Sequence, residues 1–289
     1  MKLLVLGETG QLGCEIVRQA ASARFEPATL DRSDLDLTRL DVIEPVLSDL
    51  QFEVLINCAA YTAVDAAESD AQAAFVVNAF AVERIARACS RKGARLVQVS
   101  TDYVFDGMLD RPYREDDPPG PINVYGASKL TGERLALLEH LEGTLVVRTS
   151  SVFGVGGKNF VETMLRLAGE RPRLRVVGDI AMAPTYAADL ASGILSLVEA
   201  DPEPGHYHLT GEGETTWYEF ARAVLSQAGL KAAVDCVPAA EYRTAARRPA
   251  NSVLDTGRAR ALVPPLPAWQ DALSRYLAVR EIDAASEDV

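Results

Sequence analysis

The chain has 289 residues, 48% of them hydrophobic and 24% charged, which is ordinary for a globular protein with a sizeable core. Its 41 acidic residues outnumber its 29 Lys and Arg residues, and the formal net charge of −12 argues against a nucleic-acid-binding protein and against adhesion to an anionic membrane. No apolar run approaches the ~20 residues of a membrane span, and the apolar part of MKLLVLGETG is too short for a signal peptide, so we expect a cytoplasmic location.

Short apolar runs alternate with helical stretches through the first half of the chain. Strands are expected at residues 2–6, 28–31, 54–59, 95–100 and 144–149. Apolar residues at helical spacing predict helices at 12–20, 40–50, 71–91 and 130–141. This alternation is typical of βαβ units, and strands that are apolar along their whole length fit a parallel sheet covered on both faces. The predicted fold class is therefore α/β, with a Rossmann-type doubly wound parallel sheet.

Three glycines lie between the first expected strand and the first expected helix. Gly7, Gly10 and Gly13 form a G-x-x-G-x-x-G pattern. Such glycines let the backbone turn tightly and approach a pyrophosphate, while the helix N-terminus offers unpaired N–H groups to the anion. Together with Asp31 at the end of the second strand, the pattern predicts a dinucleotide-binding site. A glycine-rich turn without a ligand is the alternative.

The second strand ends in an acid followed by a base, Asp31 and Arg32. An acid at this place binds the adenosine ribose hydroxyls, whereas an adjacent arginine can hold a 2′-phosphate. The pair does not choose cleanly between NADH and NADPH. We favour NADPH because Arg32 gives the phosphate a charge-assisted hydrogen-bond donor.

Tyr125 and Lys129 are spaced Y-x-x-x-K, which places both side chains on one face of a helix. Free tyrosine has a pKa of about 10, and a nearby ammonium is expected to lower this pKa and make Tyr125 a better proton donor or acceptor. Ser100 and Thr101 end an earlier strand, at the sheet edge where ligands bind in open α/β folds. These residues alone indicate an oxidoreductase that acts on a carbonyl or an alcohol.

Several longer motifs are similar to those of one family. They are GETGQLG (7–13), NCAAYTAVDAAE (57–68), VSTDYVFDG (99–107), PINVYGASKLTGE (121–133), VVRTS (146–150) and RPANSVLD (248–255). On these motifs the chain resembles the dTDP-4-dehydrorhamnose reductase family of the extended short-chain dehydrogenase/reductases. The resemblance implies an enzyme of deoxysugar biosynthesis that uses NAD(P)H to reduce the C4 ketone of a nucleotide-linked 4-keto-6-deoxy sugar.

The resemblance also implies roles for individual residues. Thr101, Tyr125 and Lys129 would be catalytic, with Tyr125 donating a proton to the developing alkoxide and Lys129 holding the nicotinamide ribose. The implied cofactor contacts are Gly7, Thr9, Gly10, Gln11, Leu12, Gly13, Asp31, Arg32, Asp36, Leu37, Cys58, Ala59, Ala60, Tyr61, Ser100, Tyr125 and Lys129. The implied substrate contacts are Thr101, Asp102, Tyr103, Ser151, Trp217 and Arg248.

Two lobes are expected on the same grounds. Residues 1–150 and 184–200 would form the dinucleotide-binding domain. Residues 151–183 and 201–289 would form a smaller C-terminal substrate-binding lobe that closes over the nucleotide sugar. Two departures from the family pattern fall in the sugar region: Ser151 stands where the family commonly has Trp, and the stretch DIAMAPT (179–185) differs from D-Q-x-G-x-P-T. A related 4-ketosugar reductase is therefore an alternative.

The substrate diphosphate needs local positive charge on so acidic a chain. The candidates are Arg148, Lys158, Arg247 and Arg248, and Arg248 is favoured because it lies in a matching motif.

Signals for a metal are weak. His206 and His208 form an H-x-H pattern without an evident third ligand, so we expect a packed strand there. Some members of the family place magnesium between subunits through carboxylates, and Glu15 is the candidate for that role here. A solvated glutamate on a helix is the simpler interpretation.

Two other functions stay open at this point. The regulatory subunit of methionine adenosyltransferase resembles the same family and keeps much of its motifs, so a non-catalytic NADP-binding subunit is one alternative. A nucleotide-sugar epimerase or dehydratase is the other, because a dehydratase needs an acid next to the hydroxyl residue and Asp102 follows Thr101.

The chain has four scattered cysteines and no CxxC pair. We expect all four to be buried free thiols: Cys14, Cys58, Cys89 and Cys236. Free thiols fit a reducing, cytoplasmic compartment. A homodimer is expected from base rates alone.

Overall fold

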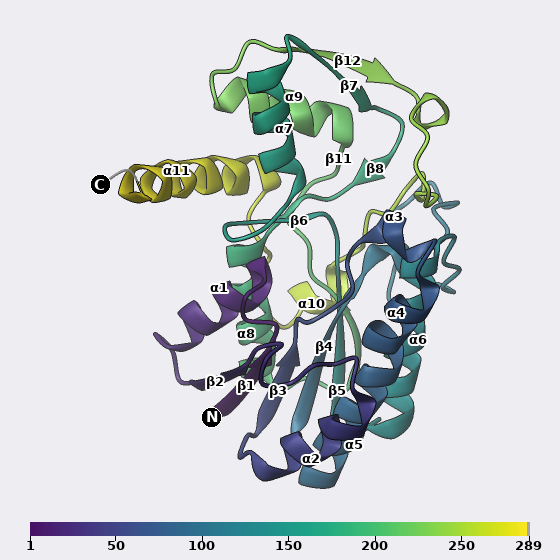
Figure 1. Ribbon diagram of the computed structural model, residues 1–289, viewed down its shortest axis with the longest axis vertical. Coiled ribbons are helices and arrows are strands. Elements are labelled where there is room, and N and C mark those ends of the chain that lie inside the picture. The colour runs from purple at the N-terminus through teal and green to yellow at the C-terminus, as the bar shows by residue number, and fades with distance from the viewer. Residues whose placement is uncertain (288–289) are drawn as a thin grey trace.

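A six-stranded, all-parallel sheet forms the centre of the larger lobe (Figure 1). The computed structural model describes the backbone of residues 1–287 and the side chains of residues 1–280. The sheet contains, in spatial order, β10 (Gly205–His208), β5 (Thr144–Thr149), β4 (Arg95–Thr101), β3 (Val54–Asn57), β1 (Lys2–Leu6) and β2 (Glu26–Leu30). The chain runs outward from β1 to β2 and then returns to β3 on the other side of β1. This order confirms the predicted doubly wound fold.

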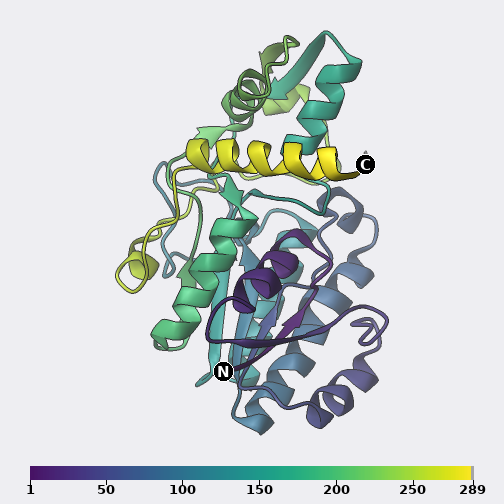
Figure 2. The same ribbon diagram turned by 90° about the vertical axis from the view of Figure 1, so that its left-hand side faces the viewer.

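Helices cover both faces of the sheet (Figures 1 and 2). Figure 2 shows α1 (Gln11–Ala20) and α8 (Ala187–Ala200) in front of one face; α2 (Leu40–Asp49), α5 (Ala81–Lys92) and α6 (Val124–Glu139) lie on the other. Leu3 and Val5 pack into the core under α1 and α8, whereas Leu4 and Leu6 pack into the core under α2 and α5. Burial of alternate side chains on opposite faces explains why strands such as β1 and β3 are apolar at consecutive positions.

The connection between β3 and α5 differs from the prediction of a single helix over residues 71–91. A short helix α3 (Val64–Ala67) is followed by α4 (Ala71–Phe75), a π-helical turn η1 (Val76–Phe80) and then α5. The turn η1 packs closely against α6, where a Cβ on Gly132 would collide with the carbonyl oxygen of Asn78. A π-helical turn has no hydrophobic period of its own, so the sequence pattern did not mark it.

Helix α6 begins at Val124, earlier than the predicted residue 130. Its N-terminus is capped by Asn123, whose Oδ1 accepts a hydrogen bond from the Gly126 N–H at 2.7 Å. The early start matters because it brings Tyr125 into the first helical turn.

The smaller lobe contains helices and three two-stranded sheets, and it lies at the top of Figure 1. Its helices are α7 (Phe160–Glu170), α9 (Trp217–Gln227) and α11 (Trp269–Glu287). The strand pairs are β7 (Arg173–Val177) with β12 (Ala233–Val237), β8 (Ala181–Met182) with β11 (Thr215–Thr216), and β6 (Val152–Phe153) with β9 (Thr185–Tyr186). Its core is aromatic, because Phe153 packs against Tyr186, Phe220 and Tyr276 with ring centroids 5.5 to 5.6 Å apart.

One part of the expected C-terminal lobe returns to the larger lobe. Strand β10 forms the edge of the six-stranded sheet, and α10 (Gly257–Arg260) packs beside it. Ala259, Val263 and Leu266 belong to the core under α8. The expected division at residue 201 differs from the structure here, because β10 (GHYH) is too short and too polar to show a strand pattern.

The prediction of buried thiols holds for Cys89, and Cys58 is half-buried, but Cys14 and Cys236 are exposed. For these two residues the prediction is wrong, because small apolar neighbours in the sequence do not fix which side of an element faces solvent. Within the described part of the chain, no helix is both long and apolar enough to span a bilayer.

Candidate active site

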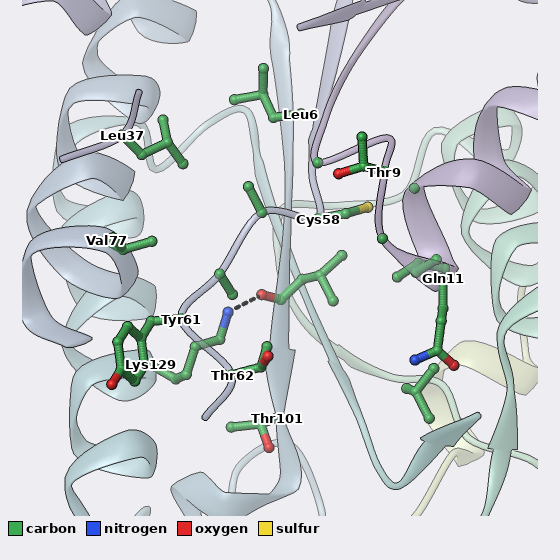
Figure 3. Close-up of a pocket in the computed structure, with 18 of the residues that line it drawn as sticks. Leu6, Thr9, Gln11, Leu37, Cys58, Tyr61, Thr62, Val77, Thr101 and Lys129 are labelled. Atoms are coloured by element: carbon green, nitrogen blue, oxygen red, sulfur yellow. Dashed lines mark hydrogen bonds between the residues drawn. The ribbon is translucent and has the colours of Figure 1, made fainter. Parts of the chain in front are cut away.

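A cavity of about 790 Å³ opens at the carboxyl end of the central sheet (Figure 3). This volume lies within the roughly 300–1,000 Å³ of typical cofactor and ligand sites. Every residue that the resemblance implies as a cofactor contact lines this cavity. Further lining residues that were not among the expected contacts are Leu6, Leu30, Leu35, Thr38, Thr62, Ala73, Val77, Val99, Thr149 and Val152. Most of these are apolar wall residues, which a sequence pattern does not distinguish from core residues.

The glycine turn between β1 and α1 has the geometry that close approach to a ligand requires. Gly7 has a φ of +84°, and a Cβ there would lie 2.7 Å from the backbone nitrogen of Ala59. A Cβ on Gly13 would collide with the Gly7 carbonyl oxygen. Gly10 is the N-cap of α1 and has no side chain that could cap the helix. The backbone N–H groups of the first turn, at the positive end of the helix dipole, therefore stay available at the cavity that this turn lines. The turn therefore fits a dinucleotide pyrophosphate.

Asp31 and Arg32 lie where β2 ends and line the same cavity. The Asp31 carboxylate is held within its own turn, accepting hydrogen bonds from the Ser33 N–H and hydroxyl at 2.6 Å each. The Arg32 side chain is 83% exposed and lies 3.9 Å from Asp36, a distance too long for a strong ion pair. Of the two candidates for the ribose end, the arginine is thus the more available.

The three residues expected to be catalytic converge on the cavity that contains the glycine turn. Thr101 ends β4, and Tyr125 and Lys129 lie one turn apart at the start of α6. A hydrogen bond links the side chains of Thr101 and Tyr125. Lys129 Nζ donates to the carbonyl oxygen of Val99 at 2.6 Å, the dashed line in Figure 3.

The prediction that the pKa of Tyr125 is lowered is wrong. Burial raises the pKa of Tyr125 to about 12, and the hydrogen bond with Thr101 opposes this shift. Burial also lowers the pKa of Lys129 to about 8, while the Glu133 carboxylate opposes that shift. Desolvation of this helical turn thus sets the direction of both pKa shifts.

A buried ion pair lies behind the cavity, and no motif in the sequence pointed to it. Arg148 on β5 donates to both carboxylate oxygens of Glu133, the shortest bond being 2.7 Å, and Ser100 Oγ donates to the same carboxylate at 2.5 Å. His206 Nε2 lies 3.3 Å from Glu133. The Arg148 guanidinium and the hydrogen bond with His206 lower the pKa of Glu133 to about 2 against the effect of burial. Arg148, a candidate for the diphosphate, is therefore already engaged.

A second buried carboxyl group has different surroundings. Asp102 follows Thr101 and is 3% exposed. Thr101 Oγ1 lies 3.0 Å and Ser150 Oγ 2.8 Å from its two oxygens, and the Ser252 hydroxyl also hydrogen-bonds it. No described residue forms an ion pair with Asp102. Burial therefore raises the pKa of Asp102 in spite of the three hydroxyl groups.

The expected sugar contacts divide into two groups. Thr101, Asp102 and Ser151 line the cavity, whereas Tyr103, Trp217 and Arg248 do not. Trp217 begins α9 and packs against Phe160 with ring centroids 4.6 Å apart, so its position serves the core of the smaller lobe.

Arg248 is not free for a diphosphate. It forms a two-point ion pair with Asp65 on α3 at 2.6 and 2.7 Å, and it also hydrogen-bonds the half-buried Tyr103. Arg248 does lie in a motif that matches the family. The sequence alone, however, does not show that its guanidinium is paired with Asp65, which lies 183 positions away. Of the other bases, Arg247 lies outside the cavity and Lys158 lines it.

Ser151 carries a strained backbone. Its φ of +47° is uncommon for a residue with a side chain, and Ser151 follows β5 closely, two residues after Thr149. Such strain is typical of functional positions, and this one lies at the cavity wall between the lobes.

Neither of the two weak metal signals gathers a ligand set. His208 is buried with Nδ1 3.1 Å from the Asp255 carbonyl oxygen, and His206 faces Glu133. The Glu15 carboxylate accepts hydrogen bonds from Arg18 at 2.6 Å and Gln19 at 3.2 Å. Among the described residues, no group of three or more His, Cys, Asp and Glu side chains could hold a metal ion. Magnesium is therefore not supported.

Comparison with known proteins gives matches along nearly the whole chain. The family model described as RmlD substrate binding domain matches residues 1–282. A dTDP-4-dehydrorhamnose reductase from Burkholderia thailandensis is 43% identical, covering 98% of this chain and 99% of the relative. The spore coat polysaccharide biosynthesis protein SpsK of Bacillus subtilis is 39% identical, covering 96% and 98%. The crystal structure of dTDP-4-dehydrorhamnose reductase from Bacillus anthracis in complex with NADP superimposes with a TM-score of 0.92 at 36% identity, covering 96% of this chain and 98% of that one.

Proposed function

Because the chain belongs to the RmlD substrate binding domain family, the family of the dTDP-4-dehydrorhamnose reductases, we propose that it reduces the C4 ketone of a nucleotide-linked 4-keto-6-deoxy sugar with NAD(P)H in deoxysugar biosynthesis. One observation carries this function: Thr101, Tyr125 and Lys129 line the same cavity as the glycine turn. A proton donor and a hydride donor can therefore meet on one ketone.

The protein's own residues supply the proton chemistry. A bound, reduced nicotinamide supplies the hydride to the ketone carbon. Tyr125, with a pKa of about 12, is fully protonated at neutral pH and donates its phenol proton to the alkoxide oxygen. The Thr101 hydroxyl hydrogen-bonds the same oxygen and so orients the ketone. Lys129, with a pKa of about 8, is mostly an ammonium at pH 7 and would hold the ribose hydroxyls of the bound cofactor.

NADPH is the proposed cofactor in preference to NADH. The Asp31 carboxylate is occupied by its own turn, while the exposed Arg32 can swing toward a 2′-phosphate. The relative from Bacillus anthracis is described in complex with NADP, which supports the same choice.

The division of labour between the lobes is also a proposal. The larger lobe would hold the dinucleotide, and the smaller lobe would cover the nucleotide sugar and exclude water from hydride transfer. Ser151 would contact the sugar from the junction of the lobes. Lys158 would meet a phosphate group, since its carbonyl oxygen accepts a hydrogen bond from Gln11 Nε2 at 3.3 Å beside the glycine turn.

We further propose a cytoplasmic location and a homodimer. All four cysteines are free thiols, which fits a reducing compartment. Light scattering on the purified protein measures the mass of the assembly.

The proposal is tested by adding dTDP-4-keto-6-deoxyglucose or its 3,5-epimer as substrate and measuring the oxidation of NADPH by its absorbance. A reductase consumes one NADPH per product molecule, and product NMR gives the C4 configuration. An epimerase or dehydratase forms product with no net loss of NADPH. Tight NADPH binding without turnover of either ketone would instead favour the non-catalytic regulatory subunit and overturn the proposal.

A further inference from the structure

Two buried carboxyl groups flank the catalytic residues, and their surroundings differ in one respect. Glu133 is paired with the Arg148 guanidinium and faces His206. Asp102 has hydroxyl neighbours from Thr101, Ser150 and Ser252 and, within the described residues, no cationic partner. An ionised carboxylate without a cation is costly inside a protein, so such a group keeps its proton. When the surroundings push the pKa values of two neighbouring acids apart in this way, one acid keeps its proton and the other is ionised, so the two can serve opposite roles.

Hydroxyl groups connect Asp102 to the phenol that gives up its proton. The carboxyl Oδ1 lies 3.0 Å from Thr101 Oγ1, and the Thr101 hydroxyl hydrogen-bonds Tyr125. On the other side, Ser150 Oγ bridges the carboxyl Oδ2 at 2.8 Å and Ser151 Oγ at 3.4 Å, and Ser151 lines the cavity. A continuous row of exchangeable protons thus runs along the cavity wall.

We propose that Asp102 is held as the neutral acid and is the proton reserve that recharges Tyr125 through the Thr101 hydroxyl. This inference rests on the proposed function for its second half, whereas the neutral state of Asp102 does not depend on any substrate. Since Asp102 acts through Thr101, it is a positioning residue of the reaction. Its titratable neighbours are Tyr103 on its own turn η2 (Asp102–Val104) and Tyr125 on α6.

The proton balance of the step is simple. Reduction of the ketone to the alcohol takes the Tyr125 proton and leaves a phenolate. The phenolate takes the Thr101 hydroxyl proton, and Thr101 takes the Asp102 proton. Asp102 then regains one proton from water, by way of Ser150 and Ser151, so the cycle consumes one solvent proton per ketone. Direct reprotonation of Tyr125 from the cavity is the competing route.

The first measurement needs neither cofactor nor substrate. A neutral carboxylic acid has an infrared carbonyl band separate from those of carboxylates. At pH 7 we expect this band in the wild type and its loss in Asp102→Asn, which keeps the shape of the side chain and still offers a hydrogen-bond donor and an acceptor. The matched control is Asp106→Asn, because the Met108 N–H and the Tyr113 hydroxyl hold the Asp106 carboxylate ionised. A wild-type spectrum without the band, or one whose band survives Asp102→Asn, overturns the proposal.

The second measurement separates the proton reserve from a merely structural role. In Asp102→Asn the single-turnover rate of hydride transfer should stay within about 3-fold, while steady-state kcat falls by about 10-fold or more because each cycle waits for a proton. A proportional fall in both rates would mean that Asp102 only shapes Thr101, and would overturn the relay. If the wild type reduces no ketone, the proposed function fails, yet the infrared band still decides whether Asp102 is neutral.

Discussion

At the scale of single residues, Tyr125 depends on burial for its chemistry. Its phenol stays protonated through neutral pH because the surroundings disfavour the phenolate. Tyr125→Phe removes this proton and leaves the ring in place. We expect kcat to fall by about 100-fold or more with NADPH affinity nearly unchanged, as measured by initial rates and by fluorescence titration.

A matched control for this substitution is Tyr113→Phe. Tyr113 is deeply buried and donates to Asp106 at 2.7 Å, but it does not line the cavity. The kcat of Tyr113→Phe should stay within about 3-fold of the wild-type value. Its free energy of unfolding should fall by about 1 kcal/mol, because one buried hydrogen bond is lost. Near-normal turnover in Tyr125→Phe would remove this residue from the mechanism.

Arg32 decides the choice of cofactor in our proposal. Arg32→Ala should raise KM for NADPH by about 10-fold or more and change KM for NADH little, because a charge-assisted hydrogen bond to a phosphate contributes about 1.5–3 kcal/mol. Arg39→Ala is the control, since Arg39 is an exposed neighbour outside the cavity. An equal change for both cofactors would show that Arg32 does not recognise the 2′-phosphate.

The residue types at the site were predictable, whereas their states were not. Thr101, Tyr125, Lys129 and the glycines were found because their spacing is short and lies within one βα unit. The pairing of Arg248 with Asp65 and of Arg148 with Glu133 depends on contacts between distant parts of the chain. The direction of the Tyr125 pKa shift depends on burial, which no local pattern reports.

At the scale of elements, the β1–α1 turn tolerates no added side-chain atom at Gly13. In Gly13→Ala the added Cβ collides with the Gly7 carbonyl oxygen, so the turn must open. The N–H groups of the first helical turn then no longer point at the pyrophosphate site. We expect NADPH affinity to fall by at least about 10-fold, with a stability loss of about 1–3 kcal/mol. Isothermal titration and urea unfolding measure the two effects.

Gly169 offers the opposite case within the same chain. It lies in α7, and a Cβ added there would meet no heavy atom within 4 Å outside its own helical turn. Gly169→Ala should therefore stabilise the protein by about 0.5–1 kcal/mol and leave NADPH affinity unchanged. If Gly13→Ala also binds NADPH normally, the glycine turn is not the pyrophosphate site.

The strands β1, β3, β4 and β5 were predicted well because both of their faces are buried, and an apolar run in the sequence then reflects burial directly. The break of the 71–91 helix at η1 was missed because a π-helical turn continues the helical composition. The strand β10 was missed because its four residues include two histidines, and His208 is buried only by tertiary contacts.

At the scale of the whole molecule, acid should weaken the fold through His208. Burial and the nearby Arg148 lower the pKa of His208 to about 3, and Nδ1 donates to the Asp255 carbonyl oxygen while Nε2 has no hydrogen-bond partner among the described residues. The unfolded chain takes up a proton below pH ~6.5, but the folded state does not until pH falls to about 3. The stability that the neutral imidazole contributes is therefore fully present above pH ~6.5 and decreases as the pH falls from ~6.5 towards 3.

Urea unfolding at a series of pH values checks this expectation with His208→Asn, which keeps a hydrogen-bond donor but does not titrate. The wild type should lose stability relative to the variant by up to about 1.4 kcal/mol per pH unit between pH ~6 and ~4. A difference that does not change with pH would show that His208 takes up a proton in the folded state as readily as in the unfolded chain.

The order in which the chain is synthesised gives the placement of β10 a consequence for biogenesis. The ribosome completes β1 to β5 long before α8, β10 and α10, so the nascent sheet has an unpaired edge at β5 and an apolar face without its helix. Unpaired edges are templates for association between chains. A chain that stalls or is cleaved between β5 and β10 should therefore aggregate, and a free nucleotide-binding fragment should not accumulate.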